Sequence, residues 1–480
     1  NATNCLFGAI VYPASMHLLI STLFPRRYGV IAAGALCTSA FTAYPWALLG
    51  VWELYPYAAS LAITPAVIVS FMHIAKSGAT RGQRVVAASG VGLGAISLFF
   101  LQPSTVFTAA VFLAPYCVAR IAQVANGRRI GKLSPQATKT LLCSGFVAFA
   151  AALWIIACKL PIINSAVSYF WWPISDPSSA IADTLTLSFA EPMPQIALAA
   201  LVVAGIVSCL RARSNTWLIA SYAIACCMFI IAASGSDTPL KHLVSGMWYT
   251  DYYRIAAFAA TFAAPLASLG LAWAARSLFD FQRKLIPDSK ALRVGLIAIA
   301  VFAFALANFR PGYTDDTGRW IDSPFAHVRG IVSAHSAATD ENPYDEEKRA
   351  FVAQVKETVG EDALILNVPF DGSIYAYSAD SLNLYQRYIS GYGWGESLDS
   401  VLVRTSLGDI ATNDLANEAA KNIGAQYILV LDRDESLMNR WFWTFEPEDW
   451  KGIVSITDDT PCFETVLAEG DMRLYRILPR

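Results

Sequence analysis

The chain has 480 residues, of which 55% are hydrophobic and only 15% are charged, and its formal net charge is −2. Soluble globular proteins of this size carry a larger charged fraction, so the composition excludes that class and predicts a polytopic α-helical membrane protein. Eight of the nine cysteines lie in apolar segments, which is not the pattern of a disulfide framework or of a paired-cysteine metal site.

The first apolar run begins at Cys5, and no basic residue precedes it. A secretory signal peptide starts with a positively charged segment, so this run does not match one. Because the first residue is Asn1 and not methionine, we expect the sequence to be a fragment of a longer protein.

Apolar runs of the length that crosses a bilayer, about 17 to 25 residues, then alternate with polar connections as far as residue 309. We predict about ten transmembrane helices in a bundle that occupies residues 1–309. They lie near residues 5–24, 28–44, 54–75, 85–101, 104–120, 140–158, 195–210, 216–234, 255–275 and 294–309.

Lysine and arginine gather in alternate connections between these helices, and the other connections are mostly acidic. Since basic connections stay in the cytoplasm, the positive-inside rule predicts that 45–53, 159–194, 235–254 and the region after Arg310 are extracytoplasmic. The 159–194 segment contains SYFWWPISDP, and we expect it to lie along the membrane face, where it can roof a cavity.

Residues 310–480 predict an extracytoplasmic α/β domain, because short apolar strands alternate there with amphipathic helices. We expect helices at 343–359 and near 412–423, strands at 363–368 and 425–431, and a closing hairpin of 463–470 and 471–478. Neither GxGxxG nor a Walker A sequence occurs, so the chain offers no nucleotide-binding motif, and we expect no nucleic-acid partner.

The segment GMWYTDYYRIAAF, residues 246–258, places Asp251 and Arg254 where an outer connection enters an apolar helix. In one interpretation the aromatic residues form an interfacial belt, and the two charges make a surface ion pair worth ~0 to 1 kcal/mol. In the other, Arg254 binds a phosphate, because a guanidinium offers a planar fork of donors that stays charged. Trp248 and Tyr249 would then contact the substrate.

Lys241 and His242 lie in the same connection, so three candidate cations face outward where cations are otherwise scarce. We expect them to assist Arg254 in binding the phosphate. Asp251 is a candidate catalytic carboxylate or, three residues from Arg254, a group that orients the guanidinium.

The segment AYPWALLGVWELYP, residues 43–56, holds a single carboxylate, Glu53. Burial against Trp46, Trp52 and Tyr55 would raise its pKa and suit it to general-base catalysis, with Trp46 contacting substrate. The alternative is that Glu53 only marks a capped helix start.

The C-terminal region offers two further candidates for substrate binding. Asp371 follows the end of a predicted strand, where α/β domains bind ligands, although a turn cap explains it as well. Trp394, in GYGWGE, either stacks on a sugar or covers the bundle. His327 and His335 have no third ligand at metal spacing, so we expect no metal site from the sequence.

The segments NATNCLFGAIVYP, YPWALLGVWELYP, LQPSTVF, MWYTDYYRIAA, VPFDGSIYAY and the terminal LYRI resemble an uncharacterised family of actinobacterial membrane proteins of unknown function. The resemblance covers nearly the whole chain, and the family's layout looks like that of the GT-C glycosyltransferases. GT-C enzymes use a carboxylate in the first extracytoplasmic loop. In the family, that loop precedes the segment that matches Asn1, so the resemblance implies that the catalytic base lies upstream.

The resemblance implies a plasma-membrane glycosyltransferase that moves a sugar from a polyprenyl-phosphate-linked donor to a cell-envelope glycan or protein on the outer face. The bilayer, the lipid-linked donor and the envelope acceptor are its expected partners, no cofactor is required, and the need for a divalent metal is left open. Two alternatives stand beside this expectation. One is a transporter or flippase for a lipid-linked or soluble substrate, and the other is a non-catalytic envelope scaffold.

Overall fold

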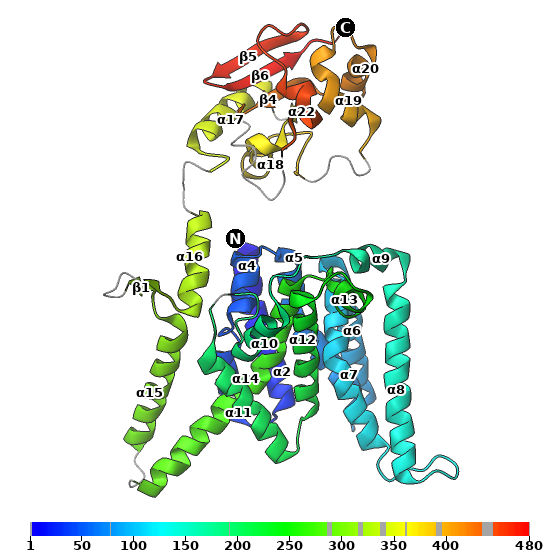
Figure 1. Ribbon diagram of the computed structural model, residues 1–480, viewed down its shortest axis with the longest axis vertical. Coiled ribbons are helices and arrows are strands. Elements are labelled where there is room, and N and C mark those ends of the chain that lie inside the picture. Colours follow the sequence, from blue (N-terminus) through cyan, green and yellow to red (C-terminus); the bar gives the residue numbers. More distant parts are fainter. Residues whose placement is uncertain are drawn as a thin grey trace. The chain divides into compact units, whose positions relative to one another are not determined.

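The computed structural model describes residues 2–76, 78–191, 193–285, 290–314, 320–336, 342–360, 362–389, 396–433 and 445–479. The chain divides into two compact units, Asn1–His335 and Ser336–Arg480. The first unit is mostly helical, and the second combines helices with a small sheet (Figure 1).

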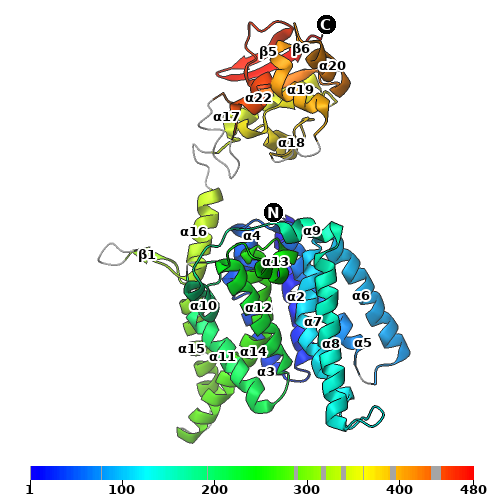
Figure 2. The ribbon, with the colours of Figure 1, turned by 45° about the vertical axis from the view of Figure 1, so that its right-hand side comes forward.

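The first unit is built from helices that run back and forth between two ends (Figures 1 and 2). Its elements are α1 (Ala2–Cys5), η1 (Leu6–Val11), α2 (Tyr12–Leu23), α3 (Tyr28–Cys37), η2 (Thr42–Ala47), α4 (Leu48–Gly50), α5 (Tyr55–Ile74), α6 (Arg81–Leu101), α7 (Ser104–Val124), α8 (Pro135–Cys158), α9 (Pro161–Ser168), α10 (Pro177–Thr186), α11 (Ile196–Ala212), α12 (Trp217–Ser234), α13 (Pro239–Ser245), η3 (Gly246–Trp248), α14 (Tyr252–Leu285), α15 (Lys290–Phe309), the strands β1 (Tyr313–Thr314) and β2 (Trp320–Ile321), and α16 (Pro324–Ser336).

Among the described residues, seven helical segments are long and apolar enough to cross a membrane. The number is eight if α3 and the η2–α4 segment, bent by 41° at their break, count as one span. Two shorter apolar helices, Ile196–Ala212 and Val294–Phe309, coincide with the remaining predicted spans. The chain is therefore a polytopic helical protein of the multi-pass membrane type, while the number of ten crossings stays a prediction.

The connections that the sequence places on opposite sides of a membrane lie at opposite ends of the bundle. α9, α13 and the start of α5 gather at one end, and the connection between α7 and α8 lies at the other (Figure 1). α9 lies across the end of the bundle and does not continue α8, which agrees with a segment lying along a membrane face (Figure 2). The structure contains no membrane, so which end faces outward stays a prediction.

α14 is the central helix of the bundle, and 94% of its most apolar 18-residue stretch is buried. Its backbone touches that of α11 because glycines leave room: a Cβ at Gly205 would lie 1.9 Å from the Leu266 carbonyl oxygen, and one at Gly270 would lie 1.9 Å from that of Leu201. In contrast, only 11% of the corresponding stretch of α6 and 6% of that of α8 are buried. α14 is thus the most deeply buried of the candidate membrane-spanning helices. A side chain on its first turn is therefore well held by its surroundings.

The second unit holds a four-stranded sheet with helices packed on it. Its elements are α17 (Glu346–Val359), β3 (Ile365–Asn367), η4 (Pro369–Asp371), α18 (Ile374–Asp380), α19 (Leu398–Ser406), η5 (Leu407–Asp409), α20 (Asp414–Ile423), β4 (Tyr427–Val430), α22 (Pro447–Val454), β5 (Phe463–Glu469) and β6 (Met472–Ile477).

The strand order is β3-β4-β6-β5, with β3 parallel to β4 and the other two pairings antiparallel. The predicted parallel pair and the closing hairpin are both present. α18, α19 and α22 were not expected from the sequence, because short helices give little periodicity to detect.

Candidate functional site

Three connections from one end of the first unit meet at the first turn of α14. In the last of them, Tyr249 and Thr250 adopt left-handed backbone conformations, with φ of 62° and 53°. Such conformations cost about 1–3 kcal/mol each in residues other than glycine, and they gather at functional sites. Thr250 is held in place because its Oγ1 accepts a hydrogen bond from Trp171 N at 2.7 Å and donates one to Tyr169 O at 3.1 Å.

Directly after this strained turn, Asp251 and Arg254 form an ion pair inside the protein. Asp251 is 1% exposed, and its Oδ2 accepts a hydrogen bond from Arg254 Nη1 at 2.8 Å. Its Oδ1 accepts a second one from Tyr253 N at 2.7 Å, which caps α14. Burial raises the pKa of the Asp251 carboxyl, and the charge of Arg254 opposes that rise. The predicted pairing is present, but it lies inside the protein and not at its surface.

The Arg254 guanidinium lies between two tyrosine rings. Its central carbon is 4.9 Å from the Tyr249 ring centroid and 5.9 Å from that of Tyr57, and the side chain is 16% exposed. Nε of Arg254 is buried and has no hydrogen-bond partner among the described residues. Buried donors normally have partners, so this nitrogen keeps a hydrogen-bonding capacity that the described residues do not use.

A second carboxylate, Glu191, is also buried in the first unit. It is 6% exposed, and burial raises its pKa to about 7, with hydrogen bonding from the Trp52 side chain opposing the rise. Trp52 in turn packs on the ring of Tyr253, with 4.5 Å between centroids. Tyr253 therefore contacts Trp52 through its ring and Asp251 through its backbone N–H.

Sequence reasoning missed Glu191 because its burial arises from contacts with segments far away in the chain. One local signal was present: it is an acidic residue in the largely apolar stretch SFAEPMPQIALAA, directly before an apolar helix. A carboxylate in such a place has few ways to stay solvated, so its burial could have been suspected.

The two other predicted cations have partners of their own. Lys241 is fully buried, and its Nζ donates hydrogen bonds to Trp171 O at 2.8 Å and to Gly235 O at 3.0 Å. Burial lowers the pKa of Lys241. The prediction that it joins Arg254 at a phosphate needs correction, because this ammonium instead fastens α13 to the 159–194 segment.

His242 also holds α13 against the 159–194 segment. Its Nδ1 is 2.6 Å from Val167 O, and its Nε2 is 2.7 Å from Asp237 Oδ1. Both ring nitrogens thus face acceptors within the protein, and neither is left for a phosphate. The structure leaves Arg254 as the cation with an open donor in this connection.

The structure also separates the predicted aromatic contacts. Trp248 is fully buried, and its Nε1 donates a hydrogen bond to Thr108 Oγ1 at 3.0 Å, so it packs inside the bundle and is not accessible to a substrate. Tyr249, by contrast, is partly exposed and covers the guanidinium. Glu53 is exposed, so the burial on which its general-base role depended is absent.

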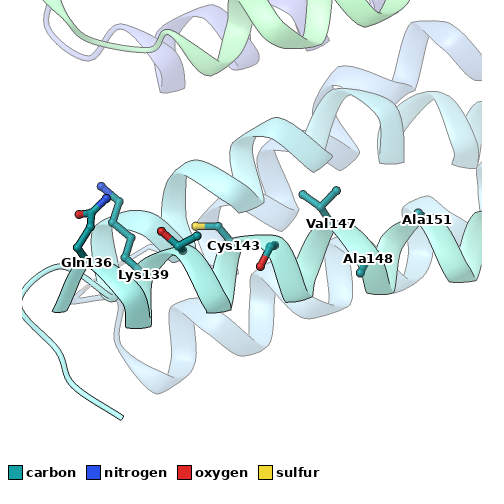
Figure 3. A pocket seen from close by; sticks show the side chains of 8 residues that line it. Gln136, Lys139, Cys143, Val147, Ala148 and Ala151 are labelled. Atoms are coloured by element: carbon teal, nitrogen blue, oxygen red, sulfur yellow. The ribbon is translucent and has the colours of Figure 1, made fainter. Parts of the chain in front are cut away.

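Trp46 lines a groove of about 520 Å³ between η1, the η2–α4 segment and α16. The walls are mostly apolar and include Phe309 and Phe325, and Arg310 and Arg329 add charge. A second groove, of about 590 Å³, follows a face of α8 from Gln136 to Ala151 (Figure 3). Neither groove borders Asp251 or Glu191, so Trp46 and the ion pair do not belong to one cavity.

In the second unit, Asp371 is 2% exposed and has a structural role. Its Oδ1 accepts a hydrogen bond from Ser373 N and its Oδ2 one from Leu431 N, both at 2.8 Å, so it joins the chain after β3 to the chain after β4. This is the turn-cap alternative and not the ligand site. Trp394 lies outside the described residues. Within the described parts of the chain, no group of three or more His, Cys, Asp or Glu side chains is placed to hold a metal ion.

The family model that matches this chain covers residues 1–478 and is described as a family of unknown function (DUF6541). No curated protein and no solved structure matches the chain. The comparisons therefore name a family without an activity, and the GT-C resemblance and the actinobacterial origin stay expectations from the sequence.

Proposed function

The chain belongs to DUF6541, a family of unknown function, and we propose that its site at the first turn of α14 transfers a sugar. The donor would be a polyprenyl-phosphate-linked sugar and the acceptor an envelope glycan or protein, as in a GT-C glycosyltransferase. The reaction would take place at the outer face of the plasma membrane, with the α/β unit on the same side.

The observation that carries this proposal is the buried Asp251–Arg254 pair with an unpartnered Arg254 Nε. Asp251 holds the guanidinium by one of its edges and restricts its rotation. Arg254 is 16% exposed and its Nε is unpartnered among the described residues. The guanidinium therefore retains N–H groups that can donate hydrogen bonds to a phosphate. A site with little water strengthens such a contact, since charges interact more strongly where the dielectric constant is low.

The residues present suggest how the reaction would proceed. The acceptor hydroxyl oxygen forms a bond to the anomeric carbon while the bond from that carbon to the phosphate oxygen breaks, and the electron pair leaves with the lipid phosphate. Arg254 stabilises the charge that develops on this leaving group. Attack from the opposite face inverts the configuration, and the hydroxyl proton passes to a carboxylate.

A transporter is the second candidate, because α3 and the η2–α4 segment are apolar helices bent by 41° at a short break. In transporters, broken helices present freed backbone groups to the substrate. Here Gln195 already fills the break: its Oε1 accepts a hydrogen bond from Thr42 N at 3.0 Å, and its Nε2 donates one to Ala40 O at 2.8 Å. With these backbone groups satisfied, the break offers less to a substrate than the Arg254 guanidinium does.

The test of the proposed function is Arg254→Lys in membranes that contain the full-length protein. Transfer would be measured with radiolabelled polyprenyl-phosphate sugars and envelope acceptors. If the guanidinium binds phosphate through two donors, lysine keeps the charge but not the fork, and transfer should fall at least about tenfold, one lost charge-assisted bond being worth ~1.5–3 kcal/mol. Asp251→Asn should have a smaller effect.

Arg211→Lys is the matched control, because Arg211 also lies over an aromatic ring, that of Trp273, and belongs to a different helix, α11. Its transfer rate should equal that of the wild type. Full activity in Arg254→Lys, at equal expression, would remove Arg254 from the donor site.

A further inference from the structure

The groove lined by Trp46 is a site of its own, separate from the Asp251–Arg254 pair. Four parts of the first unit wall it: η1, the η2–α4 segment, the end of α15 and α16. Its volume of about 520 Å³ lies in the range of ligand pockets, ~300–1,000 Å³. The groove on α8 differs, because one face of a single helix forms it. The Trp46 groove is therefore the better candidate for a bound molecule.

The walls of this groove are fastened to each other. Ser323 is 1% exposed, and its Oγ donates a hydrogen bond to Arg310 O at 2.5 Å and accepts one from Ala326 N at 3.3 Å. The start of α16 is thus attached to the end of α15. Farther along α16, a Cβ at Gly50 would lie 2.7 Å from Val332 Cγ2, so the glycine lets α16 approach α4 closely. These contacts fix the shape of the groove.

The aromatic residues of the groove offer apolar surface to a ligand. The Phe325 ring lies 5.8 Å from that of Trp46 and 4.2 Å from that of Phe309, measured between centroids. Trp46 and Phe309 nevertheless stay 44% and 45% exposed. The indole Nε1 of Trp46 already donates a hydrogen bond to Ser39 O at 2.8 Å, so this ring has no donor left for a polar ligand. An apolar chain is the ligand that suits these walls.

The charged residues of the groove are both positive. Arg310 and Arg329 line it, and no aspartate or glutamate does. Arg310 Nη2 donates a hydrogen bond to Asp322 O at 3.4 Å, whereas Arg329 is exposed and forms no ion pair with a described residue. The Asp322 carboxylate has partners of its own: Oδ1 accepts a hydrogen bond from Ser323 N at 2.9 Å, and Oδ2 is 3.5 Å from His327 Nδ1. The excess of positive charge in the groove favours an anion.

We propose that this groove binds a membrane lipid with an anionic phosphate headgroup. One hydrocarbon chain would lie against Trp46 and Phe309, and the phosphate would accept hydrogen bonds from the Arg329 guanidinium. The groove lies where the apolar helix α15 ends, at the end of the bundle that also carries α4 and α9 (Figure 1). Arginines at the end of an apolar helix are at headgroup depth, and basic pockets between membrane helices bind lipid headgroups.

A general interfacial belt would use the same residue types in a different way. In a belt, aromatic rings and snorkelling arginines contact whichever lipids surround the protein. Such contacts do not saturate at one lipid and do not depend on the shape of a groove. A lipid site in the groove instead requires saturable binding, a preference for anionic headgroups, and loss of binding when either the charge or the space is removed.

The test uses purified full-length protein in a neutral detergent, titrated with phosphatidylglycerol. Native mass spectrometry would count bound lipids, and the rise in Tm would measure binding independently. One phosphatidylglycerol should bind saturably and more tightly than phosphatidylcholine with the same chains. Arg329→Gln should weaken its binding roughly tenfold or more, because charge-assisted hydrogen bonds are lost. Lys159→Gln is the matched control: this exposed cation follows α8 at the same end of the bundle but does not line the groove, so affinity should not change.

A second variant removes the space and keeps both arginines. Ala326→Trp would fill the groove from α16, and phosphatidylglycerol should then bind as weakly as it does to Arg329→Gln. If Ala326→Trp does not fold, Ala9→Phe fills the groove from η1, where the exposed Ala9 leaves room for a larger side chain.

Three results would overturn the proposal. Equal affinity for the two lipids, or wild-type affinity in Arg329→Gln, would show that Arg329 binds no headgroup. Wild-type affinity in the folded groove-filling variant would place the hydrocarbon chain elsewhere. If inorganic phosphate alone raised the Tm as much as phosphatidylglycerol, the site would recognise phosphate without a lipid chain. None of these measurements involves sugar transfer, so their outcome is independent of the role proposed for Arg254.

Discussion

At the scale of single residues, the sequence could predict pairs that are close in the chain but not partners that are far apart. Asp251 and Arg254 are three residues apart at a helix start, and their pairing follows from helical geometry. The role of Lys241 depends on Trp171, which lies 70 residues away in the sequence. No pattern within one connection contains that information.

The buried carboxyl of Glu191 makes a prediction about stability that does not involve catalysis. Its pKa is about 7 in the folded protein against 4.5 for an unperturbed glutamate, so the folded state binds the proton more tightly. Stability from this group is therefore complete below pH 4.5 and is lost as the pH rises through 7. A shift of this size corresponds to on the order of 3 kcal/mol at high pH.

Thermal unfolding in detergent at pH 5 and pH 8 would measure this effect in wild type and in Glu191→Gln. The variant should gain stability relative to wild type on going from pH 5 to pH 8, because its neutral amide has no charge to bury. Comparing the two proteins cancels the titration of all other groups. An identical pH dependence in both would mean that Glu191 is solvated in the folded protein.

At the scale of elements, hydropathy located the apolar helices well, because each must be long and apolar whatever it packs against. It did not reveal that the span predicted at 28–44 is broken between Cys37 and Thr42. The groups freed by that break are bound by Gln195, which lies 153 residues from Thr42 in the sequence. This partner is distant in the sequence, and so the break has no local signal.

The contact between α11 and α14 gives a prediction about helix packing. In Gly270→Ala the new methyl group would lie 1.9 Å from the Leu201 carbonyl oxygen, so the two helices would have to separate. Thermal stability in detergent should fall by roughly 1–3 kcal/mol, the usual cost of overpacking. Because α14 carries Arg254, sugar transfer should fall as well.

Gly92→Ala in α6 is the matched control, since nothing lies within 4 Å of a Cβ built there. Alanine favours helices over glycine by about 1 kcal/mol, so this variant should be as stable as wild type or more so. Equal stability of the Gly270 and Gly92 variants would show that α11 and α14 do not touch as closely as described.

At the scale of the whole molecule, the sequence predicted a helical bundle followed by an α/β region, and the structure has both kinds of unit. The order β3-β4-β6-β5 follows from a parallel pair and a hairpin that could be recognised from strand patterns. The division falls between His335 and Ser336, whereas the last predicted span ended at residue 309. Hydropathy marks where apolar helices stop but not where a compact unit stops, because Phe325 of α16 packs on Trp46 of the bundle.

The orientation of the bundle is predicted by charge alone and can be tested with single cysteines. The end that carries the candidate site should face outward, because the basic connections lie at the other end. Ser165→Cys in α9 and Ala379→Cys in α18 probe the site end of the bundle and the second unit, and Lys132→Cys probes the basic end; all three positions are exposed. Cys462 would be replaced by serine in each variant to lower the background.

A membrane-impermeant maleimide should label the cysteines at 165 and 379 in intact cells, and the cysteine at 132 only after the cells are permeabilised. Lys132 is preferable to the neighbouring Gly131, whose φ of 57° would strain a cysteine. Labelling at 132 alone would reverse the orientation and place Arg254 in the cytoplasm, where the proposed outer-face acceptor could not reach it. Labelling at 165 but not at 379 would place the second unit on the opposite side of the membrane from the candidate site. Sugar transfer would then have to depend on the bundle alone.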